Sequence, residues 1–197
     1  MTLTIATLPA PLQATDEVAW KLSGDVLTGV AGAATDMFVD PAGDAPTVNA
    51  PRLVVNPDDG DFQLHARVEV GFGSTFDAGV LLLWVDERTW AKLCFEYSPQ
   101  GEPMVVTVVT RGISDDANGF IVDGNVVWLR VARRAGAYAF HASTDGARWH
   151  FVRHFSLGEA RPQVGFEVQS PTGAGVTATF TEIAYTATTL ADLRDGS

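Results

Sequence analysis

The sequence contains few of the residues that form disulfides or contact polyanions. Its 197 residues include one cysteine, Cys94, so no disulfide can form within the chain. Lysine and arginine number 13 against 24 aspartates and glutamates, which leaves a net charge of −11. A negative field of this size repels phosphate backbones and anionic lipids. We therefore expect no nucleic-acid partner and no membrane partner.

Long apolar runs are also absent. No stretch approaches the roughly 18 apolar residues of a membrane span. The N-terminal residues contain no basic segment, and Pro9 and Pro11 interrupt their apolar part, unlike a secretory signal peptide. These features predict a cytoplasmic protein.

The chain lacks the motifs of cofactor and nucleophile chemistry. It has no Gly-x-Ser-x-Gly, no phosphate-binding loop and no dinucleotide fingerprint. Gly71-Phe72-Gly73 follows a predicted strand but precedes no helical pattern, so we interpret it as a turn. We expect no cofactor.

The sequence is instead a series of short strands. Segments rich in Val, Phe, Thr and Trp are separated by Gly, Pro, Asp and Asn, and no helical periodicity is present. The predicted strands are 20–22, 26–30, 37–39, 52–55, 62–70, 78–85, 90–97, 104–110, 120–122, 126–132, 137–143, 149–155, 164–169 and 176–185. This pattern predicts one all-β domain over residues 1–197, a jelly-roll sandwich of two antiparallel sheets. We expect residues 1–19 and 186–197 to be peripheral tails.

The first hairpin joins segments 78–85 and 90–97. A four-residue loop would pair Leu83 with Lys92, and Gly79 with Glu96. One face would then carry Val80, Leu82, Trp84, Ala91, Leu93 and Phe95 as the core face. Trp90, Lys92, Cys94 and Glu96 would lie on the opposite face, because side chains alternate along a strand.

The second hairpin joins segments 137–143 and 149–155 through an Asp145-Gly146 turn. A symmetric turn pairs His141 with His150 and places Tyr138, Phe140, Trp149 and Phe151 on the core face. Cross-strand Cβ atoms lie about 5 Å apart, so His141 and His150 are the pair best placed to share a metal ion. The sequence offers no evident third ligand, and we expect no metal site.

Polar side chains gather at the end of the stretch 90–119. Arg111, Ser114, Asp115, Asp116 and Asn118 form a polar cluster that we interpret as a loop. An arginine beside aspartates and an asparagine can hold neighbouring sugar hydroxyls, or it can rigidify a loop through ion pairs. Trp90 on the same run favours sugar binding, because aromatic faces stack on the apolar faces of sugar rings.

Three glutamates, Glu69, Glu96 and Glu167, are predicted on outward faces. A retaining glycosidase needs two carboxyl groups about 5 Å apart. Nothing in the sequence shows that Glu96 and Glu167 are neighbours, so solvated or ion-paired sheet carboxylates remain the other interpretation.

Several segments resemble a domain-of-unknown-function family of concanavalin-A-like sandwiches that includes a fungal regulator of enolase. They are 36–41, 76–82, 90–101, 105–119, 143–146 and 169–171. Related modules with the Ala-Gly hairpin and a Trp-x-Lys-x-x-x-Glu strand are attached to carbohydrate-active enzymes, so the resemblance implies glycan binding. It implies no catalytic residues.

Residues and resemblance together predict a non-catalytic, lectin-like module that binds a carbohydrate or a sugar-containing metabolite. The residues expected to line its site are Trp90, Lys92, Glu96, Arg111, Asp115, Asp116, Arg130, Glu167 and Gln169. One alternative is a glycoside hydrolase or lyase that uses Glu96 with Glu167. Another is a regulatory domain whose sheet face docks on a protein partner, an enzyme of carbon metabolism.

Overall fold

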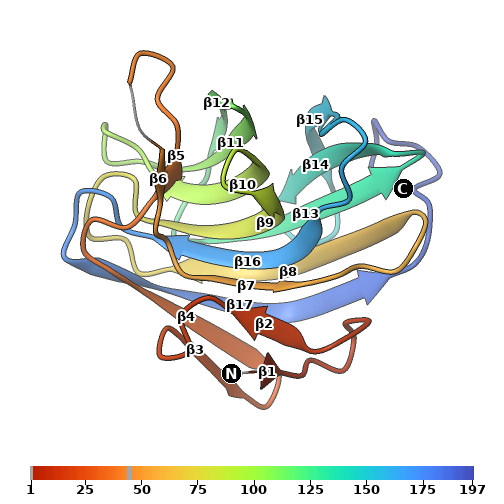
Figure 1. Cartoon of the computed structure of the whole chain (residues 1–197), viewed down its shortest axis with the longest axis horizontal. Coiled ribbons are helices and arrows are strands. Elements are labelled where there is room, and N and C mark those ends of the chain that lie inside the picture. The colour runs from red at the N-terminus through yellow and green to blue at the C-terminus, as the bar shows by residue number, and fades with distance from the viewer. Residues whose placement is uncertain (1, 44–45) are drawn as a thin grey trace.

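The computed structural model describes residues 2–43 and 46–197, which form seventeen β-strands and no helix. Two large antiparallel sheets lie face to face, with the main hydrophobic core between them (Figure 1). The protein is therefore an all-β, concanavalin-A-like jelly-roll sandwich, as predicted. Nowhere in these residues is there a helix long and apolar enough to cross a membrane.

The first sheet, sheet A, contains eight strands. In spatial order they are β1 (Thr2–Leu3), β2 (Leu12–Ala14), β7 (Arg52–Val55), β16 (Gln163–Gln169), β9 (Ala78–Asp86), β10 (Thr89–Tyr97), β11 (Pro103–Arg111) and β12 (Ile113–Ile121).

The second sheet, sheet B, contains seven strands. They are β15 (His150–Phe155), β14 (Ala137–Ser143), β13 (Val126–Arg134), β8 (Phe62–Val70), β17 (Gly175–Thr186), β4 (Val26–Gly32) and β3 (Trp20–Ser23). A separate pair, β5 (Met37–Phe38) and β6 (Thr47–Val48), lies outside both sheets.

Strand β8 shows the alternation that the sequence predicted. Leu64, Ala66, Val68 and Val70 are fully buried between the sheets, while the residues between them are half-buried on the outer face. The next strand in sequence, β9 of sheet A, differs, because its residues from Ala78 to Leu83 are all buried. Sheet A is thus covered on both faces in its centre.

The predicted register of the β9–β10 hairpin is wrong by one residue. A bulge between Thr89 and Trp90 shifts the pairing, so that Lys92 faces Leu82 and Phe95 faces Gly79. The outward direction of Lys92 and the inward direction of Phe95 are as predicted. On β9 the faces are reversed: Leu81 and Leu83 enter the main core, while Val80, Leu82 and Trp84 face outward.

The predicted pairing of the β14–β15 hairpin is also wrong. A bulge between Phe140 and His141 pairs His141 with Phe151 rather than with His150. Tyr138 and Phe140 do lie in the main core. Trp149 and Phe151 instead lie beside the outward-facing His65 and His141, at 5.8 and 5.9 Å between ring centres.

The polar cluster after Arg111 is a strand and not a loop. Residues 113–121 form β12, which pairs along its length with β11 at the edge of sheet A. An edge strand is exposed on both faces, so its sequence needs no alternation of apolar residues. This explains why hydrophobic periodicity did not reveal it.

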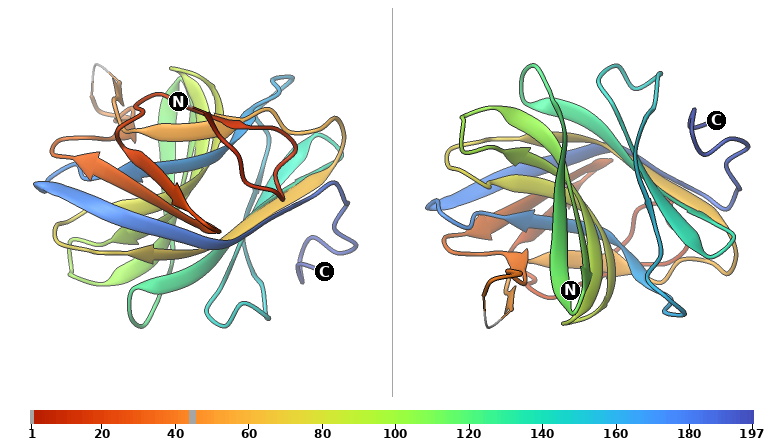
Figure 2. Two further views of the ribbon diagram at one scale, coloured as in Figure 1. Left: turned by 90° about the horizontal axis from the view of Figure 1, so that it is seen from below. Right: turned by 90° about the horizontal axis from the view of Figure 1, so that it is seen from above.

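The chain ends extend or cover the sheets. Residues 2–3 and 12–14 form β1 and β2 at one edge of sheet A, with Leu3 and Leu12 buried. Figure 2 shows that the C-terminal segment leaves β17 and runs beside sheet B. The carbonyl oxygens of Leu193 and Gly196 there contact His141 and Arg130 of that sheet.

The close approach of β7 to β16 requires glycine at position 165. A Cβ atom there would meet the backbone of Leu53 and lie 2.9 Å from the Cα atom of Val54. We expect Gly165→Ala to lower the free energy of unfolding by about 1–3 kcal/mol, because the backbone cannot move aside as a flexible side chain can. Urea unfolding measures the change.

Gly32, at the end of β4, is the matched control. A Cβ atom there has no neighbour within 4 Å. Gly32→Ala should stay within about 0.5 kcal/mol of wild type. Equal stability of the two variants would contradict the packing argument.

Candidate functional site

A strap, defined as residues 36–43 and 46–50, crosses the outer face of sheet A and carries β5 and β6 (Figure 1). Its first arm is fastened to β12. The Val39 amide donates to Ser114 Oγ (2.9 Å), and the Ser114 amide donates to the Val39 carbonyl oxygen (2.9 Å). At its base the Asp36 amide donates to Asn49 Oδ1 (2.8 Å). These contacts hold the strap against the sheet.

The strap buries Trp90. The indole packs in a small apolar cluster with Met37, Val39, Ala50, Val54 and Leu82, and it is fully buried. It stacks on Trp84 at 6.0 Å between ring centres. Trp90, expected to line a sugar site, is therefore part of the packing that supports the strap.

Beside this cluster the strap leaves a cleft of about 360 Å³ over strands β10, β11 and β12. Its lining residues are Asp36, Phe38, Asp40, Phe76, Lys92, Glu96, Val106, Val108, Asp116 and Gln169. The volume lies within the range of about 300–1,000 Å³ that is usual for small-molecule sites.

Lys92 forms part of the floor. Only 1% of the residue is exposed. Its Nζ donates to Gln169 Oε1 (2.7 Å) and lies 3.6 Å from Asp36 Oδ1. Burial by itself would lower the pKa of this ammonium, but the nearby acidic groups, Glu167 first, outweigh burial and raise it. Lys92 is therefore positively charged at neutral pH.

Glu167 lies beneath the floor. It pairs across the strands with Val80, which pairs with Cys94 of β10. The residue is fully buried, and neither carboxyl oxygen has a hydrogen-bond partner. Burial raises its pKa to about 8, opposed by Lys92. Glu167 thus holds a proton to higher pH than an exposed glutamate does, and Asp36 is the carboxylate within ion-pair distance of Lys92.

Glu96 lies at the half-buried end of β10, the strand that also carries Lys92. Burial raises its pKa to about 7, with Lys92 acting against this shift and Asp36 and Asp116 adding to it. Glu96 therefore exchanges its proton near neutral pH, a property frequent at functional sites.

Phe76 forms the opposite wall on a strained backbone. Its φ angle is +70°, which is rare for a bulky residue. The Phe76 amide donates to the Tyr97 carbonyl oxygen (2.7 Å), and its own carbonyl accepts from Gln169 Nε2 (3.2 Å). The ring remains 38% exposed. Such strain often marks a ligand-binding position, and Gln169 links this turn to Lys92.

The structure brings together four of the nine residues predicted for the site. Lys92, Glu96, Asp116 and Gln169 line the cleft, and Glu167 lies beneath it. Sequence reasoning missed Phe76 and the strap residues Asp36, Phe38 and Asp40. The acidic strap segment belonged to the family resemblance, but no local pattern signals the backbone angle of Phe76.

Arg111 and Asp115 lie elsewhere. Strand pleating turns Asp115 away from its neighbour Asp116, and its carboxylate pairs with Arg153 of β15 (3.0 Å). Arg111 is exposed at the end of β11, where Nη1 contacts the Ser156 carbonyl oxygen (3.5 Å). The predicted grouping of Arg111 with both aspartates is therefore wrong.

Arg130 and the two candidate histidines belong to sheet B. Arg130 donates to the Gly196 carbonyl oxygen (2.6 Å), and His141 Nε2 contacts the Leu193 carbonyl oxygen (2.8 Å). Burial lowers the pKa of His141 to about 4. His150 is exposed beside Phe120. Within the part of the chain that the structure describes, no three His, Cys, Asp or Glu side chains are placed to hold a metal.

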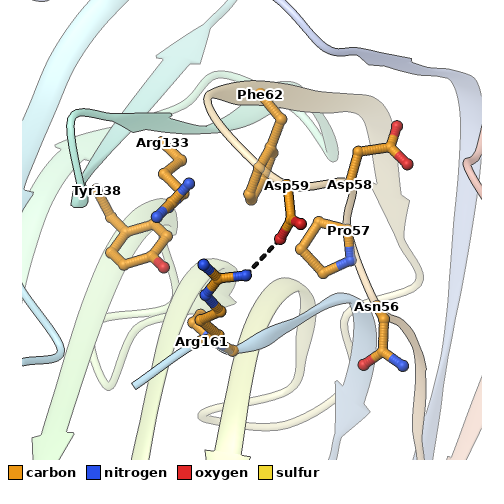
Figure 3. A pocket seen from close by; sticks show the side chains of 9 residues that line it. Asn56, Pro57, Asp58, Asp59, Phe62, Arg133, Tyr138 and Arg161 are labelled. Carbon is orange, nitrogen blue, oxygen red and sulfur yellow. Dashed lines mark hydrogen bonds and ion pairs between the residues drawn. The ribbon is translucent and has the colours of Figure 1, made fainter. Parts of the chain in front are cut away.

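A second cavity, of about 250 Å³, opens between the loops at another part of the surface (Figure 3). Arg133, Tyr138 and Arg161 surround it, with Asp59 facing Arg161. Both of its arginines already have partners, since Arg161 pairs with Asp59 and Arg133 donates to the Gly60 carbonyl oxygen. The strap cleft leaves more of its polar groups free, so it is the better candidate site.

Two packed antiparallel sheets with a strapped cleft on one outer face define an all-β sandwich. The chain belongs to the family described as "Protein of unknown function (DUF1349)", whose model matches residues 14–188. A curated relative is "Regulation of enolase protein 1" of Saccharomyces cerevisiae, 30% identical over 129 residues. That match covers 64% of this chain, and the chain spans 64% of the length of the relative.

Solved structures share the fold. A functionally unknown protein from S. cerevisiae superposes with a TM-score of 0.81 at 23% identity, over 90% of this chain and 97% of that one. The GH43 protein BlXynB of Bacillus licheniformis gives 0.69 at 14% identity, over 88% of this chain and 35% of that one. The carbohydrate-binding module CBM66 of Bacillus subtilis gives 0.55 at 11% identity, over 88% and 94%.

Glu167 creates a pH dependence of stability. The pKa of its carboxyl rises from 4.5 to about 8 on folding, so between these values the folded state binds more protons. The stabilisation is complete below the unfolded pKa and is lost as the pH rises through about 8, by up to ~1.4 kcal/mol per pH unit. We expect Glu167→Gln to match wild type in acid and to exceed it at alkaline pH in urea unfolding.

Glu69→Gln is the control, because this side chain is 46% exposed on the outer face of sheet B. Its difference from wild type should vary little with pH. A difference for Glu167→Gln that stayed constant with pH would refute the assignment of a protonated buried carboxyl.

Proposed function

We propose that this protein is a non-catalytic, lectin-like module that binds a carbohydrate or a sugar-containing metabolite in the strap cleft. The observation that carries the proposal is the composition of this cleft. Two aromatic side chains, Phe38 and Phe76, line it together with Lys92, Glu96 and Gln169. Aromatic faces beside hydrogen-bonding groups match a sugar ring, which has an apolar face and polar edges.

Each part of the cleft has a role in this proposal. Phe76 is the exposed aromatic that stacks on the ring, at the position that the strained turn holds. Glu96 and Asp116 accept hydrogen bonds from hydroxyl groups. The Lys92 ammonium has three donors, of which one binds Gln169, so it can also donate to a hydroxyl.

The fold comparison supports the same proposal by analogy. A structure named as a carbohydrate-binding module and chains named as GH43 proteins contain this type of sandwich. At 14% identity or less these likenesses concern the fold, so the argument for sugar binding rests on the cleft.

The position of Glu167 favours binding over hydrolysis. A hydrolase that used Glu96 with Glu167 would need both carboxyl groups beside the substrate. Glu167 is fully buried and does not line the cleft. Sheet spacing also places the two Cα atoms roughly 12 Å apart.

A regulatory role is the second candidate, favoured by the curated relative named "Regulation of enolase protein 1". The apolar residues Ile113 and Ile121 are each 56% exposed on edge strand β12. Capture of purified enolase by the wild-type protein, lost on changing both isoleucines to serine, would support docking of a carbon-metabolism enzyme at this edge.

Calorimetry against a panel of mono- and disaccharides tests sugar binding. We expect Phe76→Ala to raise the Kd of a bound sugar about 2- to 10-fold, because one aromatic contact contributes about 0.5–1.5 kcal/mol. Alanine at this position keeps the φ strain of phenylalanine, so the change removes mainly the ring.

Arg111→Ala is the matched control, since the side chain is exposed outside the cleft. It should bind each sugar as wild type does. No binding across the panel, or equal losses in both variants, would overturn the proposed site, and release of reducing sugar would contradict the non-catalytic role.

A further inference from the structure

The cleft carries more acidic than basic groups. Four of its lining residues end in carboxyl groups: Asp36, Asp40, Glu96 and Asp116. Within residues 2–43 and 46–197, Lys92 is the one positively charged side chain that lines it. The Lys92 ammonium already contacts Gln169 and Asp36. The other carboxyl groups are not matched by this single cation.

Glu96 and Asp116 are two cleft carboxyl groups that form no ion pair within the described part of the chain. Among the described residues, no Lys, Arg or His nitrogen lies within ion-pair distance of either carboxyl group. Both side chains project from the same face of sheet A. Asp116 pairs with Val108, which pairs with Lys92, so Asp116 shares the face of Lys92. Glu96 is four residues from Lys92 on β10, an even number, and therefore lies on that face too. They therefore border one cavity from two strands.

A third acidic group lies below them. Glu167 is fully buried with both oxygens unpartnered, and it acts on Lys92 more strongly than the other acidic groups do. Burying a carboxyl beside other acids costs free energy unless a proton or a cation supplies positive charge. The raised pKa of Glu167 reflects this cost, so Lys92 remains the one cation near the floor among the described residues.

The aromatic walls favour the same kind of ligand. A cation within about 6 Å of an aromatic ring centre is attracted to the ring face. Phe38 and Phe76 both line the cavity. Their ring faces attract cations and do not attract the carboxylates of the cleft. Aromatic rings beside carboxyl groups favour a ligand that combines an ammonium group with an apolar face.

We propose that the cleft binds an amino sugar through its protonated amine, an inference that rests on the proposed carbohydrate function. The ammonium group contacts Asp116, with the Glu96 carboxyl further along the same face, and the sugar ring lies against Phe76. N-acetylation removes the positive charge and adds bulk, so an acetylated sugar loses this contact. Uronic acids are repelled by the same carboxyl groups.

The test compares a glucosamine disaccharide with its N-acetylated counterpart by calorimetry at about pH 7, where part of the Glu96 carboxyl is ionised and most of the free amine is protonated. We expect the free amine form to bind at least about 10-fold more tightly, which corresponds to ~1.4 kcal/mol. Its affinity should fall as salt is added, since part of the attraction is between partly exposed charges.

Two neighbouring aspartates provide a matched pair of variants. Asp116→Asn removes a cleft carboxyl, and Asp115→Asn removes one that pairs with Arg153 on the other side of the strand. Both change the net charge equally. Asp116→Asn should reduce the preference for the free amine about 3- to 10-fold, whereas Asp115→Asn should leave it unchanged.

Proton release gives a second readout. At about pH 7 the Glu96 carboxyl is about half protonated, and a nearby ammonium lowers its pKa. Binding should then release up to about half a proton, seen as a dependence of the binding heat on the ionisation enthalpy of the buffer. Glu96→Gln should abolish this release.

These experiments distinguish failure of the amino-sugar inference from failure of the proposed sugar-binding function. Equal binding of both disaccharides, weakened by Phe76→Ala, overturns the amino-sugar inference and leaves sugar binding standing. Equal effects of Asp115→Asn and Asp116→Asn would show general charge attraction and overturn the amino-sugar inference. Spermidine that binds as tightly as the amino sugar would overturn the amino-sugar inference as well. Failure of every sugar removes the proposed function itself.

Discussion

The paired hydrogen bonds between Val39 of the strap and Ser114 of β12 determine which residues on the outer face of sheet A are buried. Two hydrogen bonds of 2.9 Å hold the strap over β10 to β12. Without a cover, Trp90 and Leu82 would face water, and Lys92 would be an ordinary solvated lysine. With the strap in place the tryptophan is packed, the lysine is buried, and a cleft remains between strap and sheet.

Burial under the strap then controls the charges. Water that would solvate Lys92, Glu96 and Glu167 is largely excluded, so these groups depend on one another. Lys92 keeps its proton because acids surround it. Burial raises the pKa values of Glu96 and Glu167, and the single ammonium of Lys92 offsets this only in part. The strained turn at Phe76 is tied to this cluster through Gln169. Charge, strain and aromatic surface thus meet in one place.

Sheet B shows the same principle on the opposite side of the molecule. Its outward row of His65, Arg130 and His141 would be polar surface, but the C-terminal segment covers it and accepts hydrogen bonds at Leu193 and Gly196. Arg130 packs 4.2 Å from the centre of the Trp149 ring. Both outer faces of the sandwich are therefore partly closed by irregular chain, and on sheet A the described strap residues border an acidic, aromatic cleft.

Side-chain alternation determined much of this protein from its sequence. The all-β class, the inward residues of β8 and the two faces of β10 follow from the period of two, because successive side chains on a strand must point to opposite sides. The outward directions of Lys92, Glu96 and Glu167 follow in this way, so the sequence identified the face of sheet A that carries the cleft.

The tertiary structure decided the rest. Bulges at Thr89 and His141 shifted both predicted hairpins, and a bulge depends on the fit of whole strands rather than on the turn residues. Asp115 and Asp116 were separated because an edge strand, not a loop, holds them. The strap, which makes outward residues buried ones, joins positions far apart in the chain. Such contacts depend on packing between segments that are distant in sequence, so no local pattern of residues predicts them.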